Sequence, residues 1–438
     1  MEATIITALS QILDPDLEQD IVSAGYVKDL RVENNSVSLT LDLPVHISPT
    51  VADLPTRVET AIMELDGIES VTATVSGAQP NRAVSGGQPS GLAKVKTILA
   101  VSSCKGGVGK STVAAALASE LASRGHSIGL LDTDIYGPSV PTLFNLHEEG
   151  VAGNEQQFML PVEVNGLKVF SFGFLTGRKP AVMRGPIVSN YLQQGLHRVA
   201  WDELDVLVID MPPGTGDIQL TMTQSIQIDG AVIVTTPQAL SLADVEKGIL
   251  MFDKVNVPVL GVVENMAWYT CDSCDKRHFP FGSDTSTLTD RFGLATLAQL
   301  PIDQTSYGKT FDDYTSSSDI AAATDAVLAH ARKARSVAGK APRVEFDSSS
   351  ITLQWSDGQT MTVANADLRK ACRCARCINE MSGEPILDPA TIPDDIQAKD
   401  VRTIGNYAIL VEWSDGHDSG LFPYPAIQDL MTIVGARS

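Results

Sequence analysis

Residues 98–112 read ILAVSSCKGGVGKST, and this stretch decides the fold of the central part of the 438-residue chain. The apolar run 98–101 predicts a buried strand, the glycines after it predict a tight turn, and a helical pattern begins near Lys110. Glycine has no Cβ, so the backbone can curl around an anion and point its amides at it, together with the N-terminus of the next helix. The stretch therefore predicts a phosphate-binding loop.

The side chains of this loop indicate ATP with Mg²⁺. Lys110 supplies a charge for the β- and γ-phosphates, and Ser111 supplies a hydroxyl where a phosphate-bound Mg²⁺ would lie. The string KGGVGKST resembles the deviant phosphate loop of the MinD, ParA and nitrogenase iron protein class. That resemblance implies that Lys105 reaches the ATP of a partner subunit in a homodimer, whereas a solvated lysine is the alternative. The other residues expected to bind the nucleotide are Gly106, Gly107, Val108, Gly109 and Thr112.

Charge and composition argue against several partners. The net charge is -21, from 32 Lys and Arg against 53 Asp and Glu, which argues against nucleic acid and against an anionic membrane surface. No apolar run approaches the roughly 18 residues of a membrane span, and the first residues read as a helix start rather than a signal peptide. We expect a cytoplasmic protein, or a stromal one if the chain comes from a plastid. The 6 cysteines are then thiols or metal ligands, and isolated Cys104 is a small apolar filler.

The length predicts two or three domains. Residues 1–78 predict a small α+β domain, with a helix carrying Leu9, Ile12 and Leu13 and a half-buried strand at 37–43. A second helix is expected at 57–65 and another strand at 71–75, followed by a linker at 79–92 rich in Gly, Pro and Ser. Residues 93–335 alternate strands and helices, with apolar strands expected at 128–131, 206–209, 231–234 and 259–263, which predicts an α/β domain with a doubly wound parallel sheet. Residues 342–438 predict a β-rich, cysteine-bearing domain.

Carboxylates follow two of the predicted buried strands, at the edge where an open α/β sheet binds its ligand. Asp210 is expected to hold the hydrated Mg²⁺, and Asp217, in PPGTGD, to belong to a loop that senses the γ-phosphate. Asp134 is the first candidate for orienting or deprotonating the attacking water, and Asp132 is the second. A helix cap after a strand is the alternative for each of them.

Two cysteine clusters predict metal sites. Cys271 and Cys274 have C-x2-C spacing, which lets one turn bring two thiolates to one metal atom, but two thiolates are half of a tetrahedral site. His278, the C-terminal cysteines or a second copy of the chain could complete it, and a redox disulfide is the alternative without metal. The tail has three cysteines at C-x-C-x2-C spacing, which is a strong metal signal, with a later histidine in WSDGHDSG. These four residues are Cys372, Cys374, Cys377 and His417.

The motifs SSCKGGVGKST, LLDTDIYGPSVP, VMRGPIVSNYLQQ, VLVIDMPPGTGDIQL and GVVENMAWYTCDSC together resemble the Mrp/ApbC family of ATP-dependent iron–sulfur carriers. The resemblance implies that Cys271 and Cys274 of two subunits bridge a labile 4Fe–4S cluster, received from a scaffold and passed to apo-proteins. It also implies that Asn265 contacts adenine. The three-domain order is similar to that of the plastid high-chlorophyll-fluorescence members. A positioning ATPase like MinD and an electron donor like the nitrogenase iron protein are the alternatives.

The flanking domains carry resemblances of their own. DPDLEQDIVSAGYVKDL resembles the iron–sulfur assembly domain of SufT and PaaD, but Ser48 stands where that family often has a cysteine before proline, which leaves a docking role. The tail resembles the zinc domain of gamma-butyrobetaine hydroxylase, which implies that its three cysteines and His417 hold Zn²⁺. Three thiolates and one imidazole form a closed tetrahedral site suited to structural zinc, and an iron–sulfur relay site is the rival.

Overall fold

The computed structural model divides into two compact units, Met1–Leu99 with Ala115–Ile209 and Thr315–Ser336, and Ala100–Ala114 with Asp210–Tyr314 and Val337–Ser438. Side chains of residues 77, 176, 217, 224, 242–244, 336, 425 and 432–435 are not described. The structure describes residues 1–17, 19–77, 90–146, 150–176, 192, 195–214, 216–237, 242–271, 273–282, 292–302, 317–336, 342–355, 358–374, 376–378, 384–404, 408–418 and 420–435.

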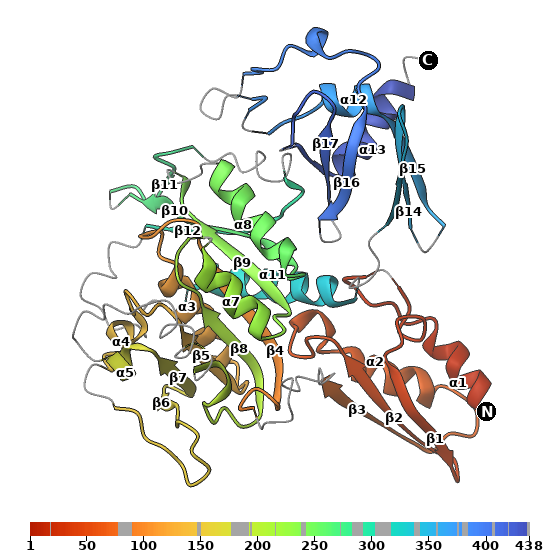
Figure 1. Ribbon diagram of the computed structural model, residues 1–438. Coiled ribbons are helices and arrows are strands. Elements are labelled where there is room, and N and C mark those ends of the chain that lie inside the picture. Colours follow the sequence, from red (N-terminus) through yellow and green to blue (C-terminus); the bar gives the residue numbers. More distant parts are fainter. Residues whose placement is uncertain are drawn as a thin grey trace. The chain divides into compact units, whose positions relative to one another are not determined.

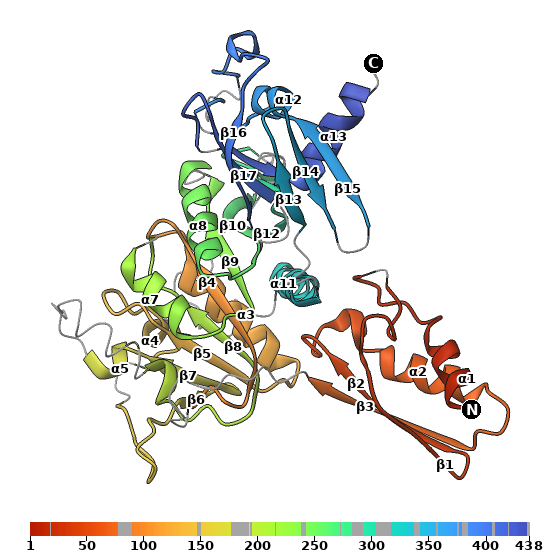
Figure 2. The same ribbon diagram turned by 45° about the vertical axis from the view of Figure 1, so that its right-hand side comes forward.

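The first 77 residues form a three-stranded sheet with two helices along one face (Figures 1 and 2). Strand β2 pairs antiparallel with β1 and parallel with β3, and its side chains alternate between buried and exposed as the sequence predicts. Pro55 lies in the first turn of α2, where the missing amide hydrogen costs nothing, so this helix starts before residue 57. The elements are α1 (Glu2–Leu9), β1 (Val27–Glu33), β2 (Ser36–Leu43), a 3-10 turn (Pro49–Val51), α2 (Leu54–Met63) and β3 (Ser70–Gly77).

The first helix is shorter than the sequence predicts. It ends at Leu9, so Ile12 and Leu13 lie beyond it; Ile12 is buried and Leu13 is 52% exposed. After Leu9 the backbone hydrogen bonds shorten to a turn, with Ile12 N–H donating to Leu9 O at 3.0 Å, and the chain then pairs with itself, because Asp14 N–H donates to Gln19 O at 2.9 Å and Ile21 N–H to Ile12 O at 3.0 Å. The Asp14 carboxylate stabilises the turn between these segments by accepting hydrogen bonds from the amides of Asp16 and Leu17, at 2.9 and 3.2 Å. An Asp that bonds to its own following backbone favours a turn over a helix.

Asp14 and Asp16 also contact the last helix of the first unit, α11 (Ser318–Ser336). The fully buried guanidinium of Arg332 forms an ion pair with Asp14 and donates hydrogen bonds to Asp16 Oδ2 at 2.9 Å and Pro44 O at 3.0 Å. Thr50 Oγ1 donates to the same Asp16 oxygen at 2.7 Å and lies 2.8 Å from Ser48 Oγ. Buried Ser48 therefore belongs to a hydrogen-bond chain that ends at Arg332.

Hydrogen bonds join nine of the described strands in one sheet, in the order β11-β10-β9-β4-β8-β5-β7-β6, with β12 beside β10. The pairs β5–β7, β9–β10 and β10–β12 are parallel, and the edge strands β6 and β11 are antiparallel to their neighbours. Every residue of β5 and β9 is buried, as a sheet covered on both faces requires. The strands are β4 (Val95–Ser102), β5 (Ile128–Asp132), β6 (Val162–Val164), β7 (Leu167–Ser171), β8 (Leu204–Asp210), β9 (Gly230–Thr235), β10 (Val259–Thr270), β11 (Arg277–His278) and β12 (Thr296–Pro301).

The helices between these strands begin with α3, whose run of small residues, KSTVAAALASELAS, buries Ala114, Ala115, Ala116 and Ala118 completely. Such small side chains let a helix pack closely on a sheet. Of the predicted linker, residues 79–89 lie outside the described part of the chain, whereas Leu92 is buried. The helices are α3 (Lys110–Ser123), α4 (Val140–Leu143), α5 (Gly173–Thr176), α7 (Asp217–Ser225), α8 (Leu242–Lys254) and α11.

The C-terminal residues form two three-stranded antiparallel sheets, β13-β14-β15 and β16-β17-β18. Their shared core includes fully buried Trp413 and the three cysteines of the tail, which makes the cysteine cluster part of the domain's interior. The elements are β13 (Arg343–Phe346), β14 (Ser350–Gln354), β15 (Thr360–Ala364), α12 (Asn365–Lys370), a 3-10 turn (Pro389–Thr391), β16 (Ala398–Ile404), β17 (Ala408–Trp413), β18 (Gly420–Pro423) and α13 (Tyr424–Gly435).

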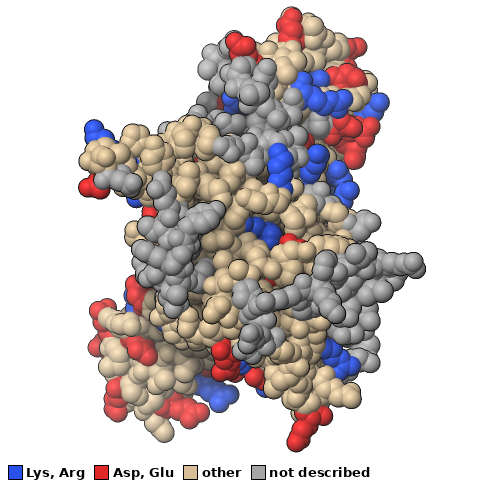
Figure 3. Space-filling view, turned by 90° about the vertical axis from the view of Figure 1, so that its left-hand side faces the viewer, with Lys and Arg blue, Asp and Glu red and all other residues tan. Residues whose placement is uncertain are grey.

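None of the described helices combines the length and the apolar character that crossing a bilayer requires. On the face drawn in Figure 3, the Lys and Arg side chains of the described residues lie interspersed with Asp and Glu. This distribution differs from the continuous basic stripe that is the footprint of a nucleic-acid site.

Candidate functional site

The phosphate loop has the backbone that its glycines predict. Gly107 and Gly109 have φ of 80° and 81°, in the left-handed region that side chains with a Cβ rarely adopt. Asn265 of β10 lies against the loop and donates a hydrogen bond from Nδ2 to Val108 O at 2.9 Å. A Cβ on Gly109 would lie 2.2 Å from that nitrogen, whereas a Cβ on Gly107 would meet nothing within 4 Å. Asn265 is 4% exposed, so its side chain is buried against the phosphate loop.

Lys110, Ser111 and Asp210 lie together, as the sequence predicts. Lys110 is 6% exposed, forms an ion pair with the buried Asp210 carboxylate and donates to Ser111 Oγ at 3.2 Å. The Ser111 hydroxyl and the Asp210 carboxylate both contact the ammonium and are hard oxygen donors of the kind Mg²⁺ prefers, so these residues fit that ion. The arrangement can hold the charge of a Mg²⁺-bound triphosphate.

The turn after Asp210 is hydrogen bonded to the strand that leads into the phosphate loop. Met211 N–H donates to Val101 O at 3.0 Å, and Gly214 N–H donates to Ser103 O at 2.8 Å. Asp217 is the first residue of α7, and its side chain is outside the described part of the structure. Lys105 is exposed on the loop, where Ser103 Oγ donates to its carbonyl oxygen at 2.8 Å.

Asp132 and Asp134 differ in exposure and in hydrogen bonding. Asp132 is fully buried, and its carboxylate accepts hydrogen bonds from Ser171 Oγ at 2.9 Å, from Val140 N–H at 3.2 Å and from Asp134 N–H at 3.1 Å. Asp134 is partly exposed, and its Oδ1 accepts from the amide of Gly137 at 3.0 Å. A carboxylate that reaches solvent can contact a water, so the geometry favours Asp134 over Asp132 for that role.

Cys271 directly follows β10, which runs to Thr270 and is seven residues longer than the predicted strand at 259–263. The same strand therefore carries Asn265 under the phosphate loop and leads into the cysteine pair. Cys271 is partly buried and Cys274 is exposed. Cys274 N–H donates to Cys271 O at 3.3 Å, so a tight turn brings the two residues together, and their sulfurs share a cluster with His278 in which ligand atoms lie within 4.8 Å of one another.

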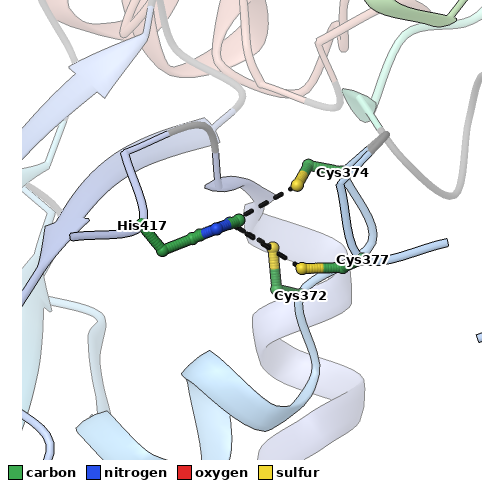
Figure 4. Close-up of side chains that lie close together, drawn as sticks. All are labelled: Cys372, Cys374, Cys377 and His417. Carbon is green, nitrogen blue, oxygen red and sulfur yellow. Dashed lines mark hydrogen bonds between the residues drawn. The ribbon is translucent and has the colours of Figure 1, made fainter. Parts of the chain in front are cut away.

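The tail brings together all four of its predicted ligands (Figure 4). Cys372, Cys374 and Cys377 come from the turn after α12, and His417 comes from the turn after β17. His417 Nε2 lies 3.3, 3.4 and 3.8 Å from the three sulfurs in chain order. A tetrahedral zinc with ordinary bond lengths sets nitrogen and sulfur about 3.6 Å apart, so the distances fit zinc.

Arg369 and Asp415 surround this cluster and were not singled out from the sequence. Buried Arg369 donates from Nη1 to Cys377 Sγ at 3.7 Å and from Nε to Asp415 Oδ2 at 2.9 Å, and Asp415 Oδ1 accepts from His417 N–H at 3.0 Å. A guanidinium beside a sulfur favours the thiolate that binds metal. Hydrogen bonds with Cys374 and Cys377 raise the pKa of His417 to about 9. The spacing of the cysteines identifies metal ligands in the sequence, whereas Arg369, just before them, has no sequence signal that distinguishes it from a surface arginine.

Comparison with known proteins assigns families to all three parts. The sequence model of the NUBPL iron-transfer P-loop NTPase matches residues 94–336, that of an iron–sulfur cluster assembly protein matches residues 2–75, and that of the gamma-butyrobetaine hydroxylase-like N-terminal domain matches residues 343–428.

Relatives similar in sequence cover most or nearly all of the chain. The chloroplastic Fe-S cluster assembly factor HCF101 of Arabidopsis thaliana is 39% identical, over 99% of this chain and 83% of its own length. The iron-sulfur cluster carrier protein of Escherichia coli is 37% identical, over 69% of this chain and 82% of its own length. A solved nucleotide-binding protein from Archaeoglobus fulgidus in complex with ADP is 40% identical, over 55% of this chain and 89% of that one, with a TM-score of 0.44.

Proposed function

Because this chain belongs to the family of NUBPL iron-transfer P-loop NTPases, in a three-domain form, we propose that it is a homodimeric ATPase that carries an iron–sulfur cluster to apo-proteins. The cargo is a labile 4Fe–4S cluster, received from an upstream scaffold in the cytoplasm or, in a plastid, the stroma. Cys271 and Cys274 of each chain supply half of its four thiolate ligands, since a cluster of this kind is held by four cysteines.

One observation carries this proposal. β10 connects the nucleotide site to the cargo site, because Asn265 bonds to the phosphate loop at 2.9 Å and Cys271 follows the last residue of the same strand. A change in the loop when ATP binds or leaves can therefore reach the cysteines through the continuous backbone of one strand. Since each chain holds only two thiolates, a small change in the position of the two hairpins alters how well the cluster is held.

The hydrolysis step uses the loop residues. Lys110 binds the β- and γ-phosphates, Lys105 of one chain reaches the nucleotide of the other, and Asp134 orients the attacking water. Ser111 and Asp210 would hold Mg²⁺, which supplies charge that neutralises the phosphates. Asp217 senses the γ-phosphate through its loop, and Asn265 contacts the adenine, as the family resemblance implies.

The tail has a different role in this proposal. Three thiolates and the imidazole of His417 form a closed set with no open position, and the ligands belong to the core of the domain. We assign it a structural Zn²⁺ that stabilises the C-terminal domain, while the first domain serves for docking.

Anaerobic reconstitution with iron and sulfide tests the proposal. We expect four iron and four sulfide per two chains in the wild type, and delivery of the cluster to an apo-ferredoxin that responds to ATP. Cys271→Ala should abolish the bridging cluster and retain ATP binding, measured by calorimetry. A cluster with the wild-type iron and sulfide content in Cys271→Ala would contradict the assignment.

A further inference from the structure

The hairpin that carries the cysteine pair brings a third metal-binding side chain to it. β10 and β11 pair antiparallel, with Tyr269 opposite His278, and Cys271 N–H donates to Lys276 O at 2.9 Å to close the hairpin. Side chains alternate along a strand, so residues 269 and 271 share a face with His278, which lies diagonally across from Cys271. One ligand atom each from Cys271, Cys274 and His278 lies within 4.8 Å of the others.

Cross-strand contacts hold the imidazole in this position. The rings of Tyr269 and His278 stack with centroids 5.3 Å apart and planes 16° from parallel. Arg277 pairs with Thr270 across the hairpin, and its guanidinium lies 3.9 Å from the ring centroid of Trp268. A cation over an indole ring is attracted to the ring. The Tyr269–His278 stack on one face of the hairpin and the Arg277–Trp268 contact on the other therefore fix the register of β11, which is only two residues long.

We propose that each chain by itself binds one divalent transition-metal ion through Cys271 Sγ, Cys274 Sγ and a ring nitrogen of His278, with the fourth coordination position open. Two thiolates with one imidazole suit Zn²⁺, Co²⁺ and Fe²⁺, and an open fourth position distinguishes an exchanging site from a structural one. Binding releases the two thiol protons to solvent. Cys274 and His278 are exposed, so an ion can enter and leave without unfolding of the hairpin.

This inference rests on the proposed function only in that the same two thiols hold the cargo. A cluster bridging two chains uses four thiolates and leaves both histidines out, so a single ion and the shared cluster compete for Cys271 and Cys274. With the imidazole as third ligand, one chain can hold a metal ion when the cysteine pair of a second chain is not opposite its own. Excess Zn²⁺ should therefore slow cluster assembly in the wild type and have a smaller effect when His278 is replaced.

Anaerobic Co²⁺ titration of the full chain tests the site, since four-coordinate Co²⁺ shows d–d bands and sulfur-to-cobalt charge transfer. The tail can bind Co²⁺ as well, so the signal of Cys271→Ser/Cys274→Ser is subtracted. His278→Phe keeps a ring to stack on Tyr269 but offers no ligand. His278→Cys offers a third thiolate.

We expect one Co²⁺ per chain in the difference titration, rather than one per two chains. His278→Phe should weaken Co²⁺ binding at least about tenfold, because replacing even a residue that only hydrogen-bonds to a metal ligand lowers metal affinity by about 10–100-fold. His278→Cys should restore binding with stronger charge transfer. Unchanged affinity and spectrum in His278→Phe, or a signal that requires two chains per ion, would overturn the proposal. Failure of cluster reconstitution with the cobalt results intact would count against the carrier function alone.

Discussion

Gly109→Ala and Gly107→Ala form a matched pair that tests how β10 supports the phosphate loop. Both glycines have nearly the same positive φ, of 81° and 80°, so both substitutions impose the left-handed penalty of about 1–2 kcal/mol. Only the Cβ at residue 109 would also meet Asn265, at 2.2 Å from Nδ2. Overpacking of this kind costs about 1–3 kcal/mol more. We therefore expect about 1–2 kcal/mol for Gly107→Ala and about 2–5 kcal/mol for Gly109→Ala.

Asn265→Ala in the Gly109→Ala background separates the two costs. It removes the amide that the new methyl meets, so it should recover the overpacking part and leave the backbone penalty. The free energy of unfolding of the nucleotide-free protein in urea measures the stability, and calorimetry measures ATP affinity in the same three variants. Equal losses at the two glycines, or no recovery in Gly109→Ala/Asn265→Ala, would refute the contact between β10 and the loop.

Three further predictions concern other parts of the molecule. Arg332→Met should lower the free energy of unfolding by about 3–5 kcal/mol, because it leaves the buried Asp14 carboxylate uncompensated. Arg335→Met on the same helix should lower it by under about 1 kcal/mol, and equal losses in urea unfolding would contradict this. Burial raises the pKa of Asp205, but hydrogen bonds from His46, Ser127 N–H and Lys96 outweigh it and lower that pKa overall. Its stabilisation is then present above about pH 4 and lost as pH falls below that value, so Asp205→Asn should flatten the acid side of the stability curve. Chelation of the tail's metal should expose the backbone amides of residues 343–435 to hydrogen exchange, while those of residues 27–77 stay protected. If the amides of the tail stay protected without metal, the assignment of a structural zinc is wrong.

Much of the fold follows from local patterns. The alternation in β2 and the continuous apolar runs of β5 and β9 predicted those strands, because burial on one or both faces leaves a direct periodic signal. The end of the first helix did not follow, since residues 12–14 pair with residues 19–21 and such pairing depends on hydrogen-bond geometry. β10 extends past residue 263 because it pairs with β11 and β12, which are distant in sequence.

The candidate site shows the same division. Lys110, Ser111 and Asp210 were predicted together because motif spacing and strand ends bring them to one place. The support from Asn265, the guanidinium of Arg369 beside Cys377 and the stacking of His278 on Tyr269 depend on contacts between segments far apart in sequence or on strand register. Residue type alone carries no signal for such contacts.

Shared ligation is the central claim, and native mass spectrometry of the anaerobically loaded protein tests it most directly. The account predicts that a species of two chains with one 4Fe–4S cluster disappears in Cys271→Ser/Cys274→Ser, while zinc in the tail remains. A single chain that retains a complete cluster through its own residues would contradict it.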